Sequence, residues 1–197
     1  MTPGELRPST PRSAWRTGWL RGARRVASPN FGPRPHGQAI DLVIVHSISL
    51  PPGEYGGDAI ERLFTNRLVA GAHSSFESIA ELRVSAHFLV RRDGGLLQFV
   101  SCDDRAWHAG VSRWRGRADC NDFSIGIELE GLEGDTFEVA QYERLAATLS
   151  GIVARYPVCA VTSHEHVAPG RKKDPGPGFD WAALARRAHG LVLEFIP

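Results

Sequence analysis

The sequence has few cysteines and no close pair of them. Cys102, Cys120 and Cys159 are the only three among 197 residues, and no C-x-x-C spacing occurs. A structural zinc site closed by four thiolate-rich ligands needs such pairs, so this class of site is excluded. An odd number of widely spaced cysteines is also typical of reduced thiols, which indicates a cytoplasmic protein.

Long apolar runs and an excess of charge are also missing. No run approaches the ~20 apolar residues that a membrane span needs. The arginine-containing N-terminal segment has no apolar stretch of secretory length, so we expect no export signal, no membrane partner and a cytoplasmic location. A formal net charge of +1 provides no broad electrostatic surface for nucleic acid, and we expect no such partner.

The chain is long enough for one domain with a substantial core. Residues 1–14 are rich in Pro, Arg, Ser and Thr and lack a periodic apolar pattern, which predicts a disordered leader. Residues 15–197 contain the apolar patterns of a single globular domain, which we expect to be monomeric.

Several short segments have the patterns of β-strands. Residues 40–45 are nearly all apolar, which predicts a strand buried on both faces. Residues 83–90 alternate, residues 96–100 form a second strand, and Asp93-Gly94-Gly95 between them predicts a hairpin turn. Residues 123–129 alternate again, with phenylalanine, isoleucine and leucine on one side.

Helical patterns lie between these strands. The longest covers residues 138–155 and is stopped by Pro157. Asp58 and Asp180 are expected to cap two shorter helices. A short strand is expected over 158–162. This interleaving predicts an α+β fold, with a mixed central β-sheet flanked by helices.

Two histidines lie just beyond predicted strands, where a sheet can hold them rigidly. His46 follows residues 40–45, and His164 follows residues 158–162. Asp174 comes ten residues after His164, in a loop too rich in proline to be helical. Two imidazoles, a carboxylate and a water make up a tetrahedral hydrolytic zinc site.

Alternatives to this ligand set remain open at this stage. Asp174 could instead be a turn former before Pro175. His166 is the main rival ligand, because in an extended segment it would share a side with His164. His108 and Asp180 are weaker rivals.

Acid–base groups could accompany such a site. Glu128 and Glu130 lie on the face of the 123–129 strand opposite its apolar face, and this face either lines a cleft or meets solvent. In a cleft, Glu128 could act as a general base. In an extended loop, Lys172 lies on the same side as Asp174 and could stabilise an oxyanion, whereas Lys173 would point away.

Four residues are candidates for binding substrate. Trp107 and His108 combine an aromatic face and a polar ring in a glycine-containing loop, as sugar recognition often requires. Arg83 could bind a carboxylate through two hydrogen bonds, or it could simply be solvated at an edge. Ser47 is the fourth candidate, and only the family resemblance given below implies it.

Six motifs along the chain together resemble those of a known family. In order, they are residues 45–53, 83–87, 91–94, 106–112, 120–131 and 171–177. In this order and spacing they resemble the AmpD-type anhydro-N-acetylmuramyl-L-alanine amidases, over residues 18–181.

The resemblance implies one zinc ion per chain, held by His46, His164 and Asp174, with Glu128 as general base and Lys172 assisting the tetrahedral intermediate. It implies the fold of amidases and peptidoglycan-recognition proteins. The implied activity is cleavage of the amide between the lactyl group of anhydro-N-acetylmuramic acid and L-alanine. The substrate would be a soluble anhydromuropeptide in cytoplasmic peptidoglycan recycling, which in the family also keeps β-lactamase induction low.

Two positions depart from the family pattern. Ser47 replaces a usual asparagine, which would shorten a contact to substrate. His166 replaces an acidic residue, which would change the partner that orients His164. Two other hypotheses are a non-catalytic muropeptide-binding module of the same fold, and an amidase that acts on the intact wall.

Overall fold

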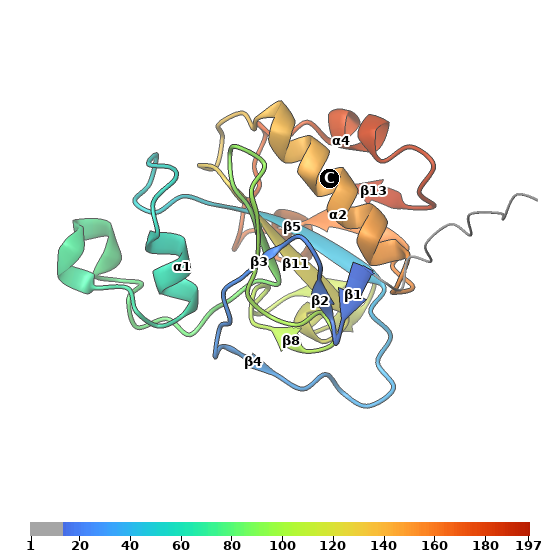
Figure 1. Cartoon of the computed structure of the whole chain (residues 1–197), viewed down its shortest axis with the longest axis horizontal. Helices are drawn as coiled ribbons and strands as arrows, with labels where there is room; N and C mark the ends of the chain where they lie inside the picture. Colours follow the sequence, from blue (N-terminus) through green and yellow to red (C-terminus); the bar gives the residue numbers. More distant parts are fainter. Residues whose placement is uncertain (1–13) are drawn as a thin grey trace, which may run out of the picture.

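A seven-stranded mixed sheet forms the centre of the molecule (Figure 1). The computed structural model describes residues 14–197. All but Ala14 of the predicted leader, residues 1–14, therefore lies outside the described residues. The strand order is β13-β12-β5-β11-β6-β7-β3. The strands, in chain order, are β3 (Arg24–Arg25), β5 (Leu42–Ile48), β6 (Phe88–Val90), β7 (Leu96–Gln98), β11 (Ser124–Glu130), β12 (Ala160–Ser163) and β13 (Glu194–Ile196).

The two longest strands, β5 and β11, are parallel neighbours at the middle of this sheet. Strands from β13 to β6 run parallel, while β6 and β7 form the antiparallel hairpin predicted around Asp93-Gly94-Gly95. Both β5 and β11 are buried over most or all of their length because both faces of the sheet are covered.

Helices cover one face of the sheet. α2 (Val139–Val153) contributes Leu145 and Leu149 to the same apolar cluster as Val45 and Ile127, and α4 (Trp181–Arg187) lies beside α2 (Figure 1). Loops cover the other face, where a smaller apolar cluster gathers around Leu42, Ile44 and Trp114. Side chains that alternate along β5 and β11 therefore enter either the helix-covered core or the loop-covered face.

The three predicted helices are present, with α2 shorter than the predicted 138–155 and with one difference in capping. α2 ends at Val153, shortly before Pro157, and the Asp180 side chain accepts from the N–H of Ala183 to cap α4. α1 (Ala59–Phe64) follows Asp58, but the Asp58 side chain makes no capping hydrogen bond. It pairs with Arg62 instead.

Two strand predictions need correction. β6 begins at Phe88 rather than residue 83, because the N–H of Ser85 donates to the carbonyl of Trp107 and takes this segment away from the sheet. His46 lies within β5 rather than beyond its end. β5 continues to Ile48 because β11 runs beside it as far as Glu130.

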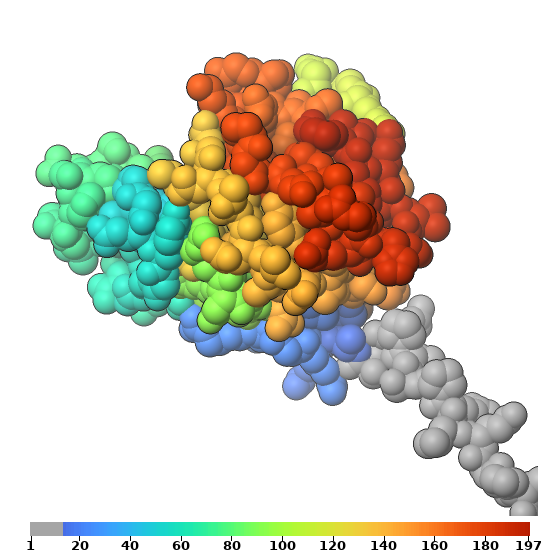
Figure 2. Space-filling view, turned by 90° about the horizontal axis from the view of Figure 1, so that it is seen from above, coloured from blue at the N-terminus to red at the C-terminus, as the bar shows by residue number. Residues whose placement is uncertain are grey.

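The remaining elements are short. α1 lies with η2 (Ala70–Ala72) and η3 (Ser74–Phe76) in a lobe at one side of the molecule (Figure 2). Two-residue strands and a further turn complete the structure: β1 (Trp15–Arg16), β2 (Trp19–Leu20), β4 (Phe31–Gly32), β8 (Arg105–Ala106), β9 (Arg113–Trp114), β10 (Arg117–Ala118) and η4 (Cys120–Asp122).

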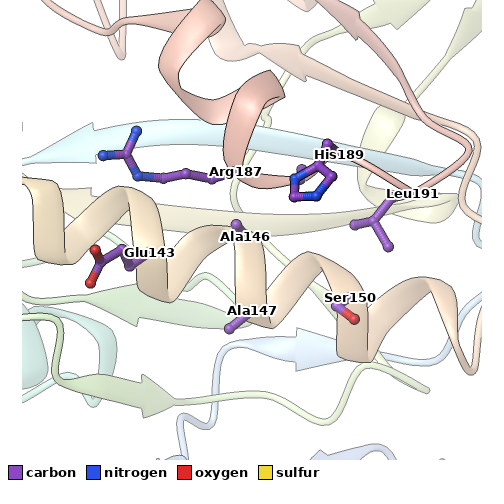
Figure 3. A pocket seen from close by; sticks show the side chains of 8 residues that line it. Glu143, Ala146, Ala147, Ser150, Arg187, His189 and Leu191 are labelled. Carbon is purple, nitrogen blue, oxygen red and sulfur yellow. The ribbon is translucent and has the colours of Figure 1, made fainter.

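A shallow cavity lies between α2 and α4, with Glu143 and Ser150 on one wall and Arg187 and His189 on the other (Figure 3). It belongs to the helix-covered face of the sheet. No helix within residues 14–197 has the length and apolar character needed to cross a membrane.

Candidate metal centre

The pairing of β5 with β11 places two predicted site residues side by side. His46 and Glu128 are register partners in these parallel strands. Because both alternate with core residues, their side chains leave the sheet on the loop-covered face. Both are almost fully buried.

His164 reaches the same place from the neighbouring strand. Ser163, the last residue of β12, pairs with Val45, so the next residue lies level with His46. His164 begins the short helix α3 (His164–Val167), in which the Ser163 side chain accepts from the N–H of His166. The loop after α3 then returns, and the N–H of Glu165 donates to the carbonyl of Asp174 over 3.1 Å.

Three ligand atoms converge where these segments meet. The Nδ1 atoms of His46 and His164 are 3.0 Å apart, and Oδ2 of Asp174 lies 3.1 Å from the first and 3.0 Å from the second. Within the described part of the chain, this is the one group of His, Cys, Asp and Glu side chains arranged to hold a metal ion.

The protonation states of this cluster also suit a cation. Burial, reinforced by the nearby His164, lowers the pKa of His46 to about 4, so its imidazole is neutral at neutral pH. Burial alone would raise the pKa of Asp174. Hydrogen bonds to His164 and His46 outweigh that effect and hold the pKa well below its usual value, so the group is a carboxylate. Metal ligands must be deprotonated in this way.

Glu128 is the unusual carboxyl group beside this cluster. Burial raises its pKa well above the usual value, the negative charge of Asp174 adds to the rise, and Lys172 opposes it. Its Oε2 atom is buried and has no hydrogen-bond partner among the described residues. A carboxyl group in this setting is suited to accept and return a proton during a reaction.

Two adjoining cavities open at the cluster. The first, of about 230 Å³, contains His46, His164, Asp174, Glu128 and Lys172 together with an apolar wall. The second, of about 550 Å³, shares Ser47, Ile48, Lys172 and Asp174 with the first and is predominantly polar. Lys173 lines only the second cavity. An extended substrate could therefore pass across the cluster from an apolar to a polar subsite.

The four candidate substrate residues separate in the structure. Ser47, Trp107 and His108 line the first cavity. Arg83 lies outside both cavities, exposed and paired with Glu81. The structure therefore brings three of the four to the cluster.

Two of the three rival ligands, His166 and Asp180, lie away from the cluster, whereas His108 lies beside His46. Because α3 is helical rather than extended, the exposed His166 diverges from His164, meets the ring of Trp114 edge-on and contacts the carbonyl of Pro197. The prediction that it neighbours His164 as an orienting partner is wrong, since Nε2 of His164 meets the carbonyl of Ala109. Asp180 caps α4.

The structure also excludes one of the two environments predicted for Glu130, the one in solvent. It does not meet solvent, although it lies two residues after Glu128. It is buried, and it receives hydrogen bonds from the Arg91 side chain and from the N–H groups of Gly56 and Arg92. Glu130 thus ties the loop after β5 to the sheet.

Sequence reasoning missed the apolar wall of the first cavity and the support behind the cluster. Leu63, Phe64, Leu82 and Val84 form that wall. Asn121 lies within a motif that we quoted, but no signal in the sequence separates it from its neighbours. Its side chain accepts from two consecutive N–H groups, those of His108 and Ala109.

The family can now be assigned. The family model described as N-acetylmuramoyl-L-alanine amidase matches residues 36–177, which include all three residues of the cluster as well as Glu128 and Lys172. The chain belongs to the N-acetylmuramoyl-L-alanine amidase family. The predicted enzyme class is therefore confirmed.

Individual relatives place this amidase close to the AmpD type. It is 55% identical to the 1,6-anhydro-N-acetylmuramyl-L-alanine amidase AmpD of Citrobacter freundii, over 84% of this chain and 89% of that protein. The crystal structure of a selenomethionine AmpD derivative is 52% identical, covers 87% of this chain and 97% of its own, and superposes with a TM-score of 0.84. The AmpD-type resemblance and the α+β fold class are confirmed.

A more distant relative has been solved with a ligand. The amidase AmiD from Escherichia coli, in complex with anhydro-N-acetylmuramic acid-L-Ala-D-γ-Glu-L-Lys, is 29% identical with a TM-score of 0.56. The match covers 78% of this chain and 60% of that one.

Proposed function

We propose that this amidase is a zinc hydrolase that cleaves the amide between the lactyl group of 1,6-anhydro-N-acetylmuramic acid and L-alanine in soluble muropeptides. The convergence of His46, His164 and Asp174 in a cavity that also contains Glu128 carries the proposal. Its similarity to AmpD-type amidases supports the anhydro sugar as substrate.

The donor set fits one zinc ion. Two neutral imidazole nitrogens and a carboxylate oxygen are ligands that zinc prefers, and bonds of about 2.0–2.1 Å in a tetrahedron would place them about 3.3 Å apart. The three separations of 3.0–3.1 Å are close to that value. With three protein ligands, a fourth position stays open, as in catalytic rather than structural sites.

A zinc ion bound here would lower the pKa of a coordinated water toward ~7 and polarise the carbonyl of the substrate. Glu128 would take the proton from the attacking water and deliver it to the departing nitrogen of L-alanine. Lys172 lines the same cavity, and its ammonium would donate a hydrogen bond to the oxyanion that develops. The buried Glu128 Oε2 atom, which has no hydrogen-bond partner within residues 14–197, supports this use.

We further infer that the enzyme works in the cytoplasm, in peptidoglycan recycling. All three cysteines are free, and Cys102 and Cys120 are buried in separate apolar clusters. This pattern supports a reducing compartment. Cell fractionation with a periplasmic marker protein tests this location. Recovery of the enzyme in the same fraction as the marker would contradict a cytoplasmic location.

Removal and restoration of zinc test whether hydrolysis depends on the metal. The purified chain should contain about one zinc per molecule and release the peptide from anhydro-N-acetylmuramic acid-L-Ala-D-γ-Glu-L-Lys. Exhaustive chelation should abolish release, and added zinc should restore it. Full hydrolysis after chelation would overturn the zinc mechanism.

A parallel assay on insoluble sacculi tests the substrate. We expect much slower release from sacculi than from the soluble anhydromuropeptide. Equal or faster release from sacculi would instead make this an amidase of the intact wall.

A further inference from the structure

The two imidazoles of the cluster each have a second nitrogen that points away from it. Nε2 of His164 lies 3.1 Å from the carbonyl oxygen of Ala109. Nε2 of His46 lies 3.0 Å from Nδ1 of His108. His108 and Ala109 are consecutive, so one loop meets the outer side of both histidines.

The hydrogen bonds around His108 can run in only one direction if Nδ1 of His46 binds a metal. Nε2 of His46 must then carry the proton and donate it to Nδ1 of His108. The proton of His108 is left on Nε2, which lies 3.3 Å from Oγ of Ser124. Ser124 donates its own proton to the carbonyl of Cys120 over 2.6 Å, so its oxygen is free to accept.

The position of the His108 ring is also fixed by packing. A Cβ atom at Gly126 would lie 2.4 Å from Cγ and 2.6 Å from Nδ1 of His108. The imidazole therefore packs directly against the backbone of β11 at Gly126, two residues before Glu128. The backbone of the loop that carries this ring is also fixed, because Oδ1 of Asn121 accepts the N–H groups of His108 and Ala109 over 3.1 and 2.8 Å.

We propose that His108 is a positioning residue for the metal ligand His46. It accepts the Nε2–H of His46, and it thereby holds the imidazole in the tautomer and orientation that direct Nδ1 at the ion. The proposal rests on the proposed zinc function. It differs from the expectation that His108 binds substrate, although the ring also borders the first cavity.

Substitutions of His108 distinguish the positioning of His46 from the binding of substrate. His108→Leu keeps most of the volume but removes the acceptor for His46. His108→Asn restores an oxygen close to the position of Nδ1. His36→Leu is the matched control, since it removes an exposed histidine far along the chain from the loop of Ala109.

The main measurement is the zinc dissociation constant from competition with a fluorescent chelator. Loss of the partner of a metal-bound histidine typically weakens binding 10–100-fold. We therefore expect a weakening of about that size in His108→Leu, substantial recovery in His108→Asn and the wild-type value in His36→Leu. A wild-type dissociation constant in His108→Leu, with activity lost through KM alone, would overturn the proposal in favour of a substrate contact.

Two further measurements keep the test decisive if His108→Leu folds poorly. Gly126→Ala retains every hydrogen-bonding group but displaces the ring, and it should weaken zinc binding in the same direction. Nitrogen NMR of the zinc-loaded wild-type protein should show the proton of His46 on Nε2. A proton on Nδ1, or unchanged affinity in Gly126→Ala, would contradict the role of His108. If wild-type protein binds no zinc, the proposed function itself fails, which is a separate outcome.

Discussion

At the scale of single residues, the cavity contains two carboxyl groups with opposite properties. Asp174 stays ionised because its carboxylate lies against the imidazoles of His164 and His46, whereas burial favours the protonated form of Glu128. One group is thereby suited to hold a cation and the other to exchange a proton. The difference arises from the partners of each group and not from residue type.

Glu128→Gln tests the division of roles directly. The amide preserves the shape of the side chain but cannot take a proton, so we expect turnover of the soluble anhydromuropeptide to fall about 10²-fold or more. Zinc content should stay at about one per chain, because Glu128 is not among the three converging ligands. Undiminished turnover would remove Glu128 from the role of general base.

Lys172 should also set the pH dependence of the reaction. A general base must be ionised, so kcat/KM falls as the pH falls through the pKa of Glu128. The charge of Lys172 lowers that pKa, and Lys172→Met removes the effect. The acid limb of the kcat/KM profile should therefore move to higher pH.

Lys173→Met is the matched control for this shift, since Lys173 lines only the second cavity. Its acid limb should coincide with that of wild type. An unmoved limb in Lys172→Met would show that Lys172 does not act on the base.

At the scale of elements, the loop after β5 depends on a buried ion pair. Arg91 donates to Glu130 over 2.6 Å and also to Glu61 in α1, so it joins the sheet, the loop and the lobe. The Glu130 side chain is only 2% exposed. A charge at that depth is costly when its partner is removed.

We therefore expect Arg91→Ala to lower the free energy of unfolding by about 3 kcal/mol, because it leaves the Glu130 carboxylate buried without a cation. Urea denaturation monitored by circular dichroism measures this change. Arg115→Ala breaks the half-exposed pair with Glu194 and should cost less than about 1 kcal/mol. Equal losses in the two variants would contradict the account of the buried pair.

At the scale of the whole molecule, Arg34 links the N-terminal part of the chain to the loops on the site face. Its guanidinium donates to the backbone carbonyls of Cys102, Asn121, Asp122 and Ser124, and it also lies 3.1 Å from Nε2 of His87. Burial lowers its pKa to about 10, which still leaves it charged at neutral pH. The group thus supports the segment that carries both Asn121 and Ser124.

Arg34→Lys should destabilise the fold although it preserves the charge. An ammonium has three donors and cannot reproduce the planar fork, and each lost hydrogen bond from a charged donor costs about 1.5–3 kcal/mol. We expect at least about 2 kcal/mol less stability in urea denaturation. The exposed Arg16→Lys is the control, and a wild-type midpoint in Arg34→Lys would refute the linking role.

Elements whose signals are local could be predicted from the sequence. Apolar continuity in β5, the amphipathic period of α2, the stop before Pro157 and the glycine turn after β6 all depend on neighbouring residues. The family, and the three residues that converge in the cluster, could be identified from the motifs. The resemblance rather than the spacing separated Asp174 from the alternative of a simple turn former.

The tertiary structure alone decided what surrounds these residues. Pairing of β5 with β11 placed His46 opposite Glu128, and helical rather than extended geometry in α3 removed His166 from the cluster. Ala109 and His108 became partners of the ligand histidines through contacts spanning 55 and 62 positions of the chain. No local pattern encodes such contacts, because they depend on the register of strands and the return path of loops.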